Sequence, residues 1–88
     1  MKLIIAIVRD MDNDTVSHAL TQENYRVTYV ASTGGFLRKG QSTLMIGVED
    51  DLVSRALEII HKNVTQPSEN DPRQSIIFVL PVEQFHHF

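Results

Sequence analysis

Residues 24–47 read NYRVTYVASTGGFLRKGQSTLMIG, and this stretch decides the fold. Its first part alternates, with Tyr25, Val27, Tyr29 and Ala31 on one side and Arg26, Thr28 and Val30 on the other. Such alternation is typical of a half-buried β-strand, because successive side chains of a strand point to opposite faces. The apolar run at 44–46 predicts a second strand. The stretch therefore predicts strand, glycine-rich loop, strand.

The loop between these strands combines glycines with an apolar pair. Gly34 and Gly35 can bring backbone N–H groups close to a ligand, and Arg38 and Lys39 add positive charge. An exposed Phe36 beside such groups would suit a flat, anionic ligand, for which a nucleotide is the natural candidate. The alternative is that the two glycines only make a tight turn and that Phe36 folds back into the core.

Composition limits the protein to a few classes. Its 88 residues make one domain, 1–88, and so small a domain gains stability from self-association. The net charge of −3 argues against nucleic acid polymers as partners. The absence of cysteine rules out disulfides and thiolate metal sites, which fits a reducing cytoplasm. We expect a cytoplasmic protein without a membrane partner, because the apolar run at the N-terminus is too short for a signal peptide and no segment could span a bilayer.

The segment before residue 24 predicts a strand and a helix. Leu3–Val8 is apolar throughout, so both faces of this strand should be buried. Asp12 is placed to cap the helix that follows, and Asn24 is a suitable left-handed stop at its end. The aspartates at 10, 12 and 14 do not form a calcium loop, because Thr15 stands where that loop needs glycine.

The segment after residue 47 predicts a second helix and a last strand. The helix begins at Glu49–Asp51, carries a wide apolar face and ends at Lys62–Asn63. Residues 65–74 are polar apart from two prolines and predict a loop that we expect to be mobile. Residues 75–82 are apolar on both faces and predict the last strand, in which Pro81 marks an edge or an end.

The predicted order β-α-β-β-α-β is typical of the ferredoxin-like fold, an α+β sandwich with an antiparallel sheet and both helices on one face. Two helices cover one face only, whereas the first and last strands are apolar on both. The uncovered face therefore needs a partner, and a second copy of the chain in closed symmetry is the simplest one. Clefts between such subunits are natural ligand sites.

No motif indicates catalysis. Residues 35–42 approach a phosphate-binding P-loop, but Gln41 stands in the place of its lysine and a strand follows instead of a helix. None of the four histidines has the spacing of a metal site, and no nucleophile elbow or acid–base pair is present. We therefore expect neither an enzyme nor a bound metal.

Several stretches together resemble the cyclic di-AMP receptor family of Gram-positive bacteria, the PII-like PstA or DarA proteins. The matching stretches are 1–6, 24–28, 33–37, 46–50 and 78–86, with Thr-Gly-Gly-Phe-Leu at 33–37 as the signature. The resemblance implies a signal-transduction protein that forms a ferredoxin-like homotrimer. It also implies one cyclic di-AMP in each cleft between subunits, an unidentified downstream protein and no catalysis.

The resemblance also implies the ligand contacts. By position they fall on Asn24, Arg26, Thr28, Gly35, Phe36, Leu37, Gln41, Gly47, Phe78 and His87. Asn and Thr side chains can bond base edges, and an Arg guanidinium can fork onto phosphate or lie over a base. Phe36 offers a stacking face, and the glycines admit close approach.

The chain departs from the family at three places. Gln41 stands where asparagine is usual, and His87 stands where glutamine is usual. The family also carries a long loop between the second helix and the last strand, where this chain has only residues 65–74. Two alternatives to cyclic di-AMP binding therefore stay open, namely a PII-like regulator of ATP or ADP and a ligand-free structural or partner-binding trimer.

Overall fold

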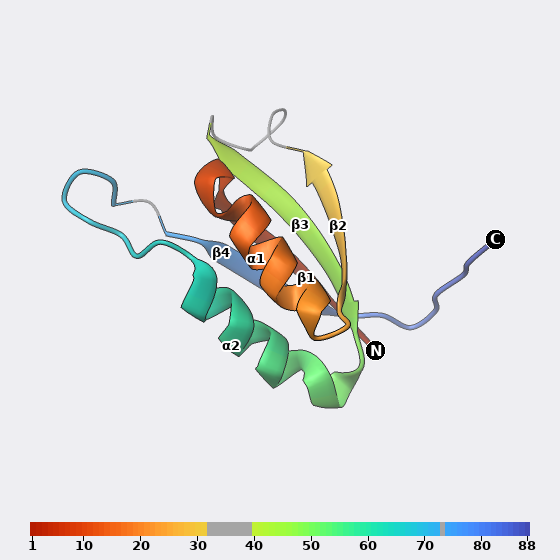
Figure 1. The fold of residues 1–88 in the computed structure, drawn as a ribbon. Helices are drawn as coiled ribbons and strands as arrows, with labels where there is room; N and C mark the ends of the chain where they lie inside the picture. Colours follow the sequence, from red (N-terminus) through yellow and green to blue (C-terminus); the bar gives the residue numbers. More distant parts are fainter. Residues whose placement is uncertain (32–39, 73) are drawn as a thin grey trace.

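The computed structural model describes residues 1–31, 40–72 and 74–88 of the chain. Figure 1 follows these residues through the predicted alternation of strands and helices. The elements are β1 (Lys2–Arg9), α1 (Asp10–Gln22), β2 (Arg26–Ala31), β3 (Gln41–Val48), the short 3-10 helix η1 (Asp50–Leu52), α2 (Val53–Asn63) and β4 (Ile76–Pro81). Asn24 has the left-handed φ of 69° that the sequence predicts for the end of α1.

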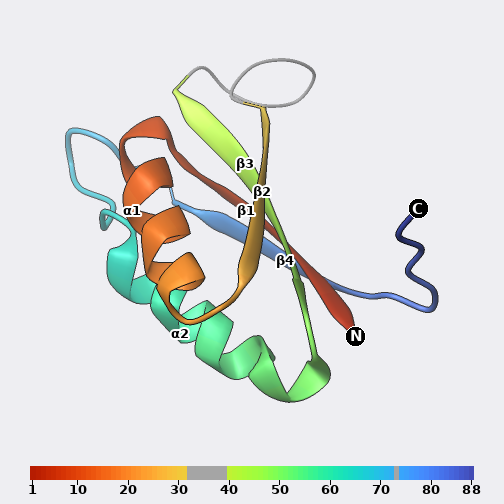
Figure 2. The ribbon, with the colours of Figure 1, turned by 45° about the vertical axis from the view of Figure 1, so that its right-hand side comes forward.

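The strands form one four-stranded antiparallel sheet in the spatial order β2-β3-β1-β4. The strand β1 is central and pairs with β3 on one side and β4 on the other, so Pro81 ends a strand at the sheet edge. Both α1 and α2 cover the same face, and within the described residues the opposite face carries no helix (Figures 1 and 2). This architecture confirms the α+β class and the ferredoxin-like topology.

Alternation along β1 separates the two faces of the sheet. Ile4, Ala6 and Val8 point toward the helices and are completely buried, whereas Leu3 and Ile5 point to the uncovered face and are only half-buried. The residues that pack with the helix-facing side chains of β1 are Val16, Leu20, Leu44, Ile46, Ala56, Ile59 and Ile60. Each of the valine, leucine and isoleucine side chains among them stabilises the fold by roughly 1.5–3 kcal/mol. The helices therefore complete one core and leave Leu3 and Ile5, on the second face of β1, only half-buried within the described part of the chain.

The prediction that Asp12 caps α1 was wrong. Arg9 occupies the cap position and makes no capping bond through its side chain, while Asp12 lies in the first turn and is 5% exposed. Its carboxylate accepts hydrogen bonds from the backbone N–H and the hydroxyl of Thr65, at 2.8 and 2.7 Å. A carboxylate near the start of a helix can accept hydrogen bonds from the N–H groups of its own first turn or from a distant segment. In this protein the Asp12 carboxylate accepts them from the distant segment.

Replacing Asp12 with alanine should lower the free energy of unfolding by about 1–3 kcal/mol, because the N–H of Thr65 loses a buried charged acceptor. Urea denaturation followed by circular dichroism measures the change. Asp14→Ala is the matched control, since Asp14 is an exposed carboxylate on the same helix. Equal losses in the two variants would contradict the assigned role of Asp12.

The connection between α2 and β4 is bonded to the body at both ends. Thr65 holds its start through Asp12, and near its end Arg9 Nη2 donates to the carbonyl oxygen of Asp71 at 3.0 Å. The Arg9 guanidinium also lies 3.6 Å from the Asp71 carboxylate. Between these points, Ser68 and Asp71 close a turn with two hydrogen bonds. The expectation of a mobile loop took no account of these contacts, which the polar composition does not reveal.

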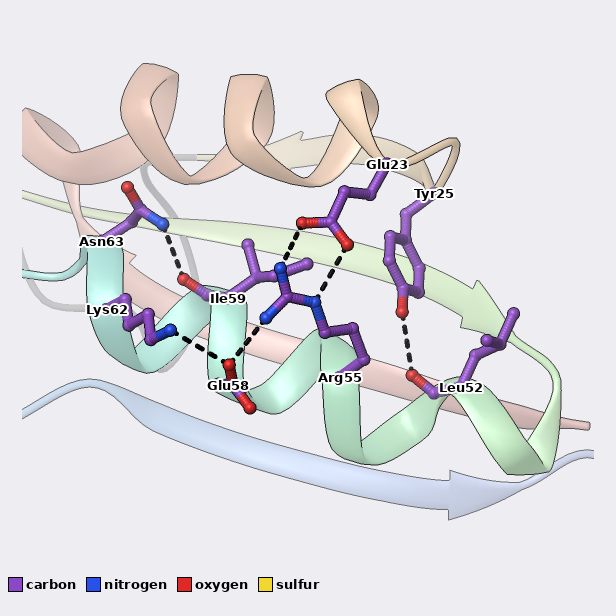
Figure 3. A network of polar contacts seen from close by, with 8 residues as sticks. All are labelled: Glu23, Tyr25, Leu52, Arg55, Glu58, Ile59, Lys62 and Asn63. Atoms are coloured by element: carbon purple, nitrogen blue, oxygen red, sulfur yellow. Dashed lines mark hydrogen bonds and ion pairs between the residues drawn. The ribbon is translucent and has the colours of Figure 1, made fainter.

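A polar network ties α2 to the end of α1 (Figure 3). Arg55 donates to both carboxylate oxygens of Glu23, at 2.9 and 2.6 Å, and also to Glu58. The Tyr25 hydroxyl donates to the carbonyl of Leu52 at 3.0 Å, and burial raises the pKa of this phenol. These contacts fix the start of β2, the strand that carries Arg26 and Thr28 into the site.

Stability should depend on pH through the pair of Glu23 and Arg55. The hydrogen bond from Arg55 lowers the pKa of Glu23 below its usual 4.5. The pair therefore contributes its full stabilisation above pH 4.5 and loses it as the pH falls through the lowered pKa. We expect Arg55→Met to be less stable than the wild type at pH 7 and the difference to shrink in acid. Urea denaturation at a series of pH values tests this, and a difference independent of pH would refute it.

Candidate functional site

The uncovered face of the sheet presents rows of side chains that run across all four strands. From β2 to β4, one row is Arg26, Gly47, Leu3 and Leu80, and the next is Thr28, Met45, Ile5 and Phe78. Members of a row share a face, because residues directly opposite each other in a sheet point to the same side. The face is therefore polar along β2 and apolar along β1 and β4.

The apolar part of this face is conspicuously exposed. On β4, Ile76, Phe78 and Leu80 keep 47%, 49% and 42% of their side-chain surface accessible. Such a continuous apolar patch is uncommon on a monomeric protein and marks a surface that contacts something else.

A pocket of about 600 Å³ lies where the first row meets the two chain ends. Its lining consists of Met1, Lys2, Leu3, Arg26, Thr28, Met45, Gly47, Val82 and Phe85. The backbone N–H of Val82 donates to the carbonyl of Met1 at 3.0 Å, which extends the pairing of β1 and β4 into the pocket wall. Both termini leave the body at this end of the sheet (Figures 1 and 2).

Glycine at position 47 shapes the bottom of the pocket. A Cβ atom added to Gly47 would lie 3.1 Å from the terminal methyl group of Met1, closer than ordinary packing allows. Any larger residue would therefore have to shift the end of the flexible Met1 side chain. The glycine thus keeps the backbone of β3 open to close approach.

The start of the chain is held in place at the pocket. The α-ammonium group of Met1 lies 2.9 Å from Oδ1 of Asp50, and this contact lowers the pKa of the Asp50 carboxyl. Together with the bond to Val82, this ion pair fixes Met1 on two sides. The part of the pocket wall that Met1 forms is therefore already in place without a ligand.

Arg26 brings a guanidinium to the pocket, which Lys2 also lines. Arg26 is exposed and pairs with Gly47 in the register of β2 and β3, and its side chain makes no hydrogen bond or ion pair with the described residues. A guanidinium in this state can fork onto a phosphate without breaking an existing contact. Thr28, two residues further along the same face, adds a hydroxyl that can donate or accept.

The structure brings together only part of the residues that the sequence suggested. Arg26, Thr28 and Gly47 line the pocket, and Phe78 lies on the same face in the neighbouring row, outside the lining. Gly35, Phe36 and Leu37, which were expected to complete the site from the loop, lie outside the described residues.

Three further candidates are not among the lining residues within one chain. Asn24 occupies the turn between α1 and β2, and His87 belongs to the tail after β4. Gln41 lies at the opposite end of β3, where it pairs with Arg9 and is 6% exposed. In a single subunit these three side chains do not join Arg26.

Sequence reasoning missed several lining residues. Leu3 and Met45 could have been found, because the alternation of their strands places them on the face of Arg26. Val82 ends the predicted last strand on the face of Leu80, whereas Phe85 had no such signal, since it lies beyond that strand in a segment without periodicity. Their place in the pocket depends on the pairing of β1 with β4, which joins the two ends of the chain.

Residues 1–31, 40–72 and 74–88 contain no cluster of three or more His, Cys, Asp or Glu side chains that could hold a metal ion. Neither is any helix among them long and apolar enough to cross a membrane.

Two comparisons show which known proteins this chain is similar to. The crystal structure of a functionally unknown protein from Pediococcus pentosaceus ATCC 25745 superposes with a TM-score of 0.79 at 38% sequence identity. The match covers 99% of this chain and 96% of that chain, so the two have nearly equal lengths. The family described as cyclic-di-AMP receptor matches residues 1–70, which include Arg26, Thr28 and Gly47. Since this match spans most of the sequence, the chain belongs to the cyclic-di-AMP receptor family.

Proposed function

We propose that the protein is a cytoplasmic signal-transduction receptor that binds cyclic di-AMP in the clefts between the subunits of a homotrimer and catalyses no reaction. One observation carries this proposal: the pocket of a chain in the cyclic-di-AMP receptor family joins Arg26, Thr28 and Gly47 above an apolar floor. Binding would pass a signal to a downstream protein.

The chemistry of the pocket suits a cyclic dinucleotide. Its volume of about 600 Å³ is within the range of small-molecule sites. Arg26 can hold a phosphate through two N–H groups, and the Thr28 hydroxyl can bond a base edge. Leu3 and Met45 offer an apolar surface for an adenine ring. An anion with flat apolar parts uses all of these groups at once.

The uncovered face supports a trimer. A stable monomer would leave Ile76, Phe78 and Leu80 in water, whereas closed association buries them. Association would also explain why Asn24, Gln41 and His87 are scattered in one subunit, because a neighbouring chain can bring some of them to the pocket. The site is then complete only in the assembly.

We expect light scattering at micromolar concentration to give three times the mass of the 10.0 kDa chain. The physical reason is the burial of the β1 and β4 side chains, which removes apolar surface from water. Analytical ultracentrifugation over a dilution series provides the control for concentration. A monodisperse monomer would refute the trimer and, with it, the shared cleft.

Calorimetric titration tests the ligand. Cyclic di-AMP should bind with one site per chain, and linear ATP and ADP should bind much more weakly. The short 65–74 segment, within which the family match ends, favours one alternative, a regulator of another adenine nucleotide. Heat with ATP or ADP but none with millimolar cyclic di-AMP would establish that alternative. No heat with any nucleotide would favour a structural or partner-binding trimer.

A further inference from the structure

We propose that Phe85, in the tail after β4, stacks on an adenine base of the ligand bound beside Arg26. This inference rests on the proposed function and adds a residue to it. The resemblance assigns Phe36 and Phe78 to the site and does not include Phe85. Phe85 is added only because it lines the pocket.

Phe85 is held at the pocket without being packed into the core. It is among the lining residues, yet 68% of its surface is exposed. Among the aromatic rings of the described residues, it pairs with that of His87, at a centroid distance of 6.5 Å. The tail is fixed three residues earlier, where Val82 donates to Met1. The backbone before Phe85 is therefore held in place, while the ring itself is exposed and can stack on another ring.

The surroundings of Phe85 favour a nucleobase over a purely apolar partner. Arg26 lines the same pocket, and Thr28 adds a hydroxyl beside it. An apolar peptide would leave the guanidinium without a counter-charge, whereas a nucleotide supplies phosphate next to a flat ring. The Leu3 and Met45 side chains complete an apolar surface for that ring.

Phe78 occupies a different position and has a different use. It lies opposite Ile5 in the second row of the uncovered face and does not line the pocket of its own chain. Its neighbours along β4 are the exposed Ile76 and Leu80, so it belongs to the surface that we assign to association. The two aromatic side chains can therefore be separated by experiment.

The test compares Phe85→Leu, Phe85→Tyr and the control Phe88→Leu with the wild type. Phe88 belongs to the same tail, is fully exposed and does not line the pocket. Titration calorimetry with cyclic di-AMP gives the affinity, and a cyclic dinucleotide that carries 2-aminopurine reports stacking through quenching of its fluorescence. Light scattering of each variant gives the oligomeric state.

Loss of the aromatic face should weaken binding of Phe85→Leu by about 5- to 150-fold and reduce the quenching. Phe85→Tyr keeps the ring and should bind within about threefold of the wild type. Phe88→Leu should bind like the wild type.

Three results would overturn the inference. The first is equal affinity and quenching in Phe85→Leu and the wild type, which would leave cyclic di-AMP binding intact and remove only the stacking role. The second is a change of mass in Phe85→Leu, which would make Phe85 an association residue. The third is a wild type that does not bind cyclic di-AMP, in which case the proposed function fails first and the stacking role with it.

Discussion

Ile76→Asp should convert the protein from trimers to monomers at micromolar concentration. Ile76 lies at the start of β4 on the uncovered face, and 47% of its surface is exposed in the single chain. In the monomer a carboxylate there would stay in water and change stability little. In the assembly it would be buried without a partner, which costs about 3–5 kcal/mol for each subunit. Light scattering measures the loss of mass.

The matched control is Leu52→Asp. Leu52 is an aliphatic residue with nearly the same exposed fraction, 46%, but it lies in η1, beside the helical layer. This variant should keep the mass of the wild type. A trimeric Ile76→Asp, or dissociation of both variants, would show that the uncovered face is not the association surface.

Arg26→Ala should weaken cyclic di-AMP binding by about 2–5 kcal/mol, provided that the guanidinium pairs with a buried phosphate. The cost is large because truncation leaves the phosphate without its counter-charge inside the cleft. The folded protein should be unaffected, since the Arg26 side chain makes no hydrogen bond or ion pair with the described residues. Titration calorimetry gives the affinity, and thermal denaturation checks the fold.

Two further variants sharpen the assignment of Arg26. Arg26→Lys keeps the charge but loses the two-pronged geometry, so its affinity should lie between those of the wild type and Arg26→Ala. Lys62→Ala removes a charge from α2, on the helical side of the molecule, and should bind like the wild type. If Arg26→Ala weakened binding no more than Lys62→Ala, the phosphate would lie elsewhere.

The topology could be predicted because it depends on local patterns. Alternation in residues 25–31, continuous apolar character in Leu3–Val8 and the wide apolar face of α2 each specify one element, and the order of elements limits the fold. The two-sided apolar character of β1 also predicted the uncovered face correctly. These signals reside in neighbouring residues and need no knowledge of distant contacts.

The parts that sequence reasoning missed are contacts between distant segments. Asp12 has the residue type and position of a helix cap, but its carboxylate bonds Thr65, which is 53 positions away. Phe85 reaches the pocket because β1 pairs with β4. Gln41 was expected beside the ligand, yet in one chain it lies at the other end of β3 from Gly47. Spacing alone cannot reveal such pairings, since tertiary structure decides them.

The bonded connection between α2 and β4 has a consequence for how this receptor could evolve. Thr65 and Asp71 tie its ends to Asp12 and Arg9 with contacts that the chain makes by itself. Its shape should therefore be the same in every signalling state, and ligand binding should bring no heat-capacity change from ordering it. In such a design, ligand binding and the contact with a downstream partner use separate parts of the molecule. An insertion at residues 66–70 could add a surface for a new partner while the pocket lined by Arg26, Thr28 and Gly47 stays as it is.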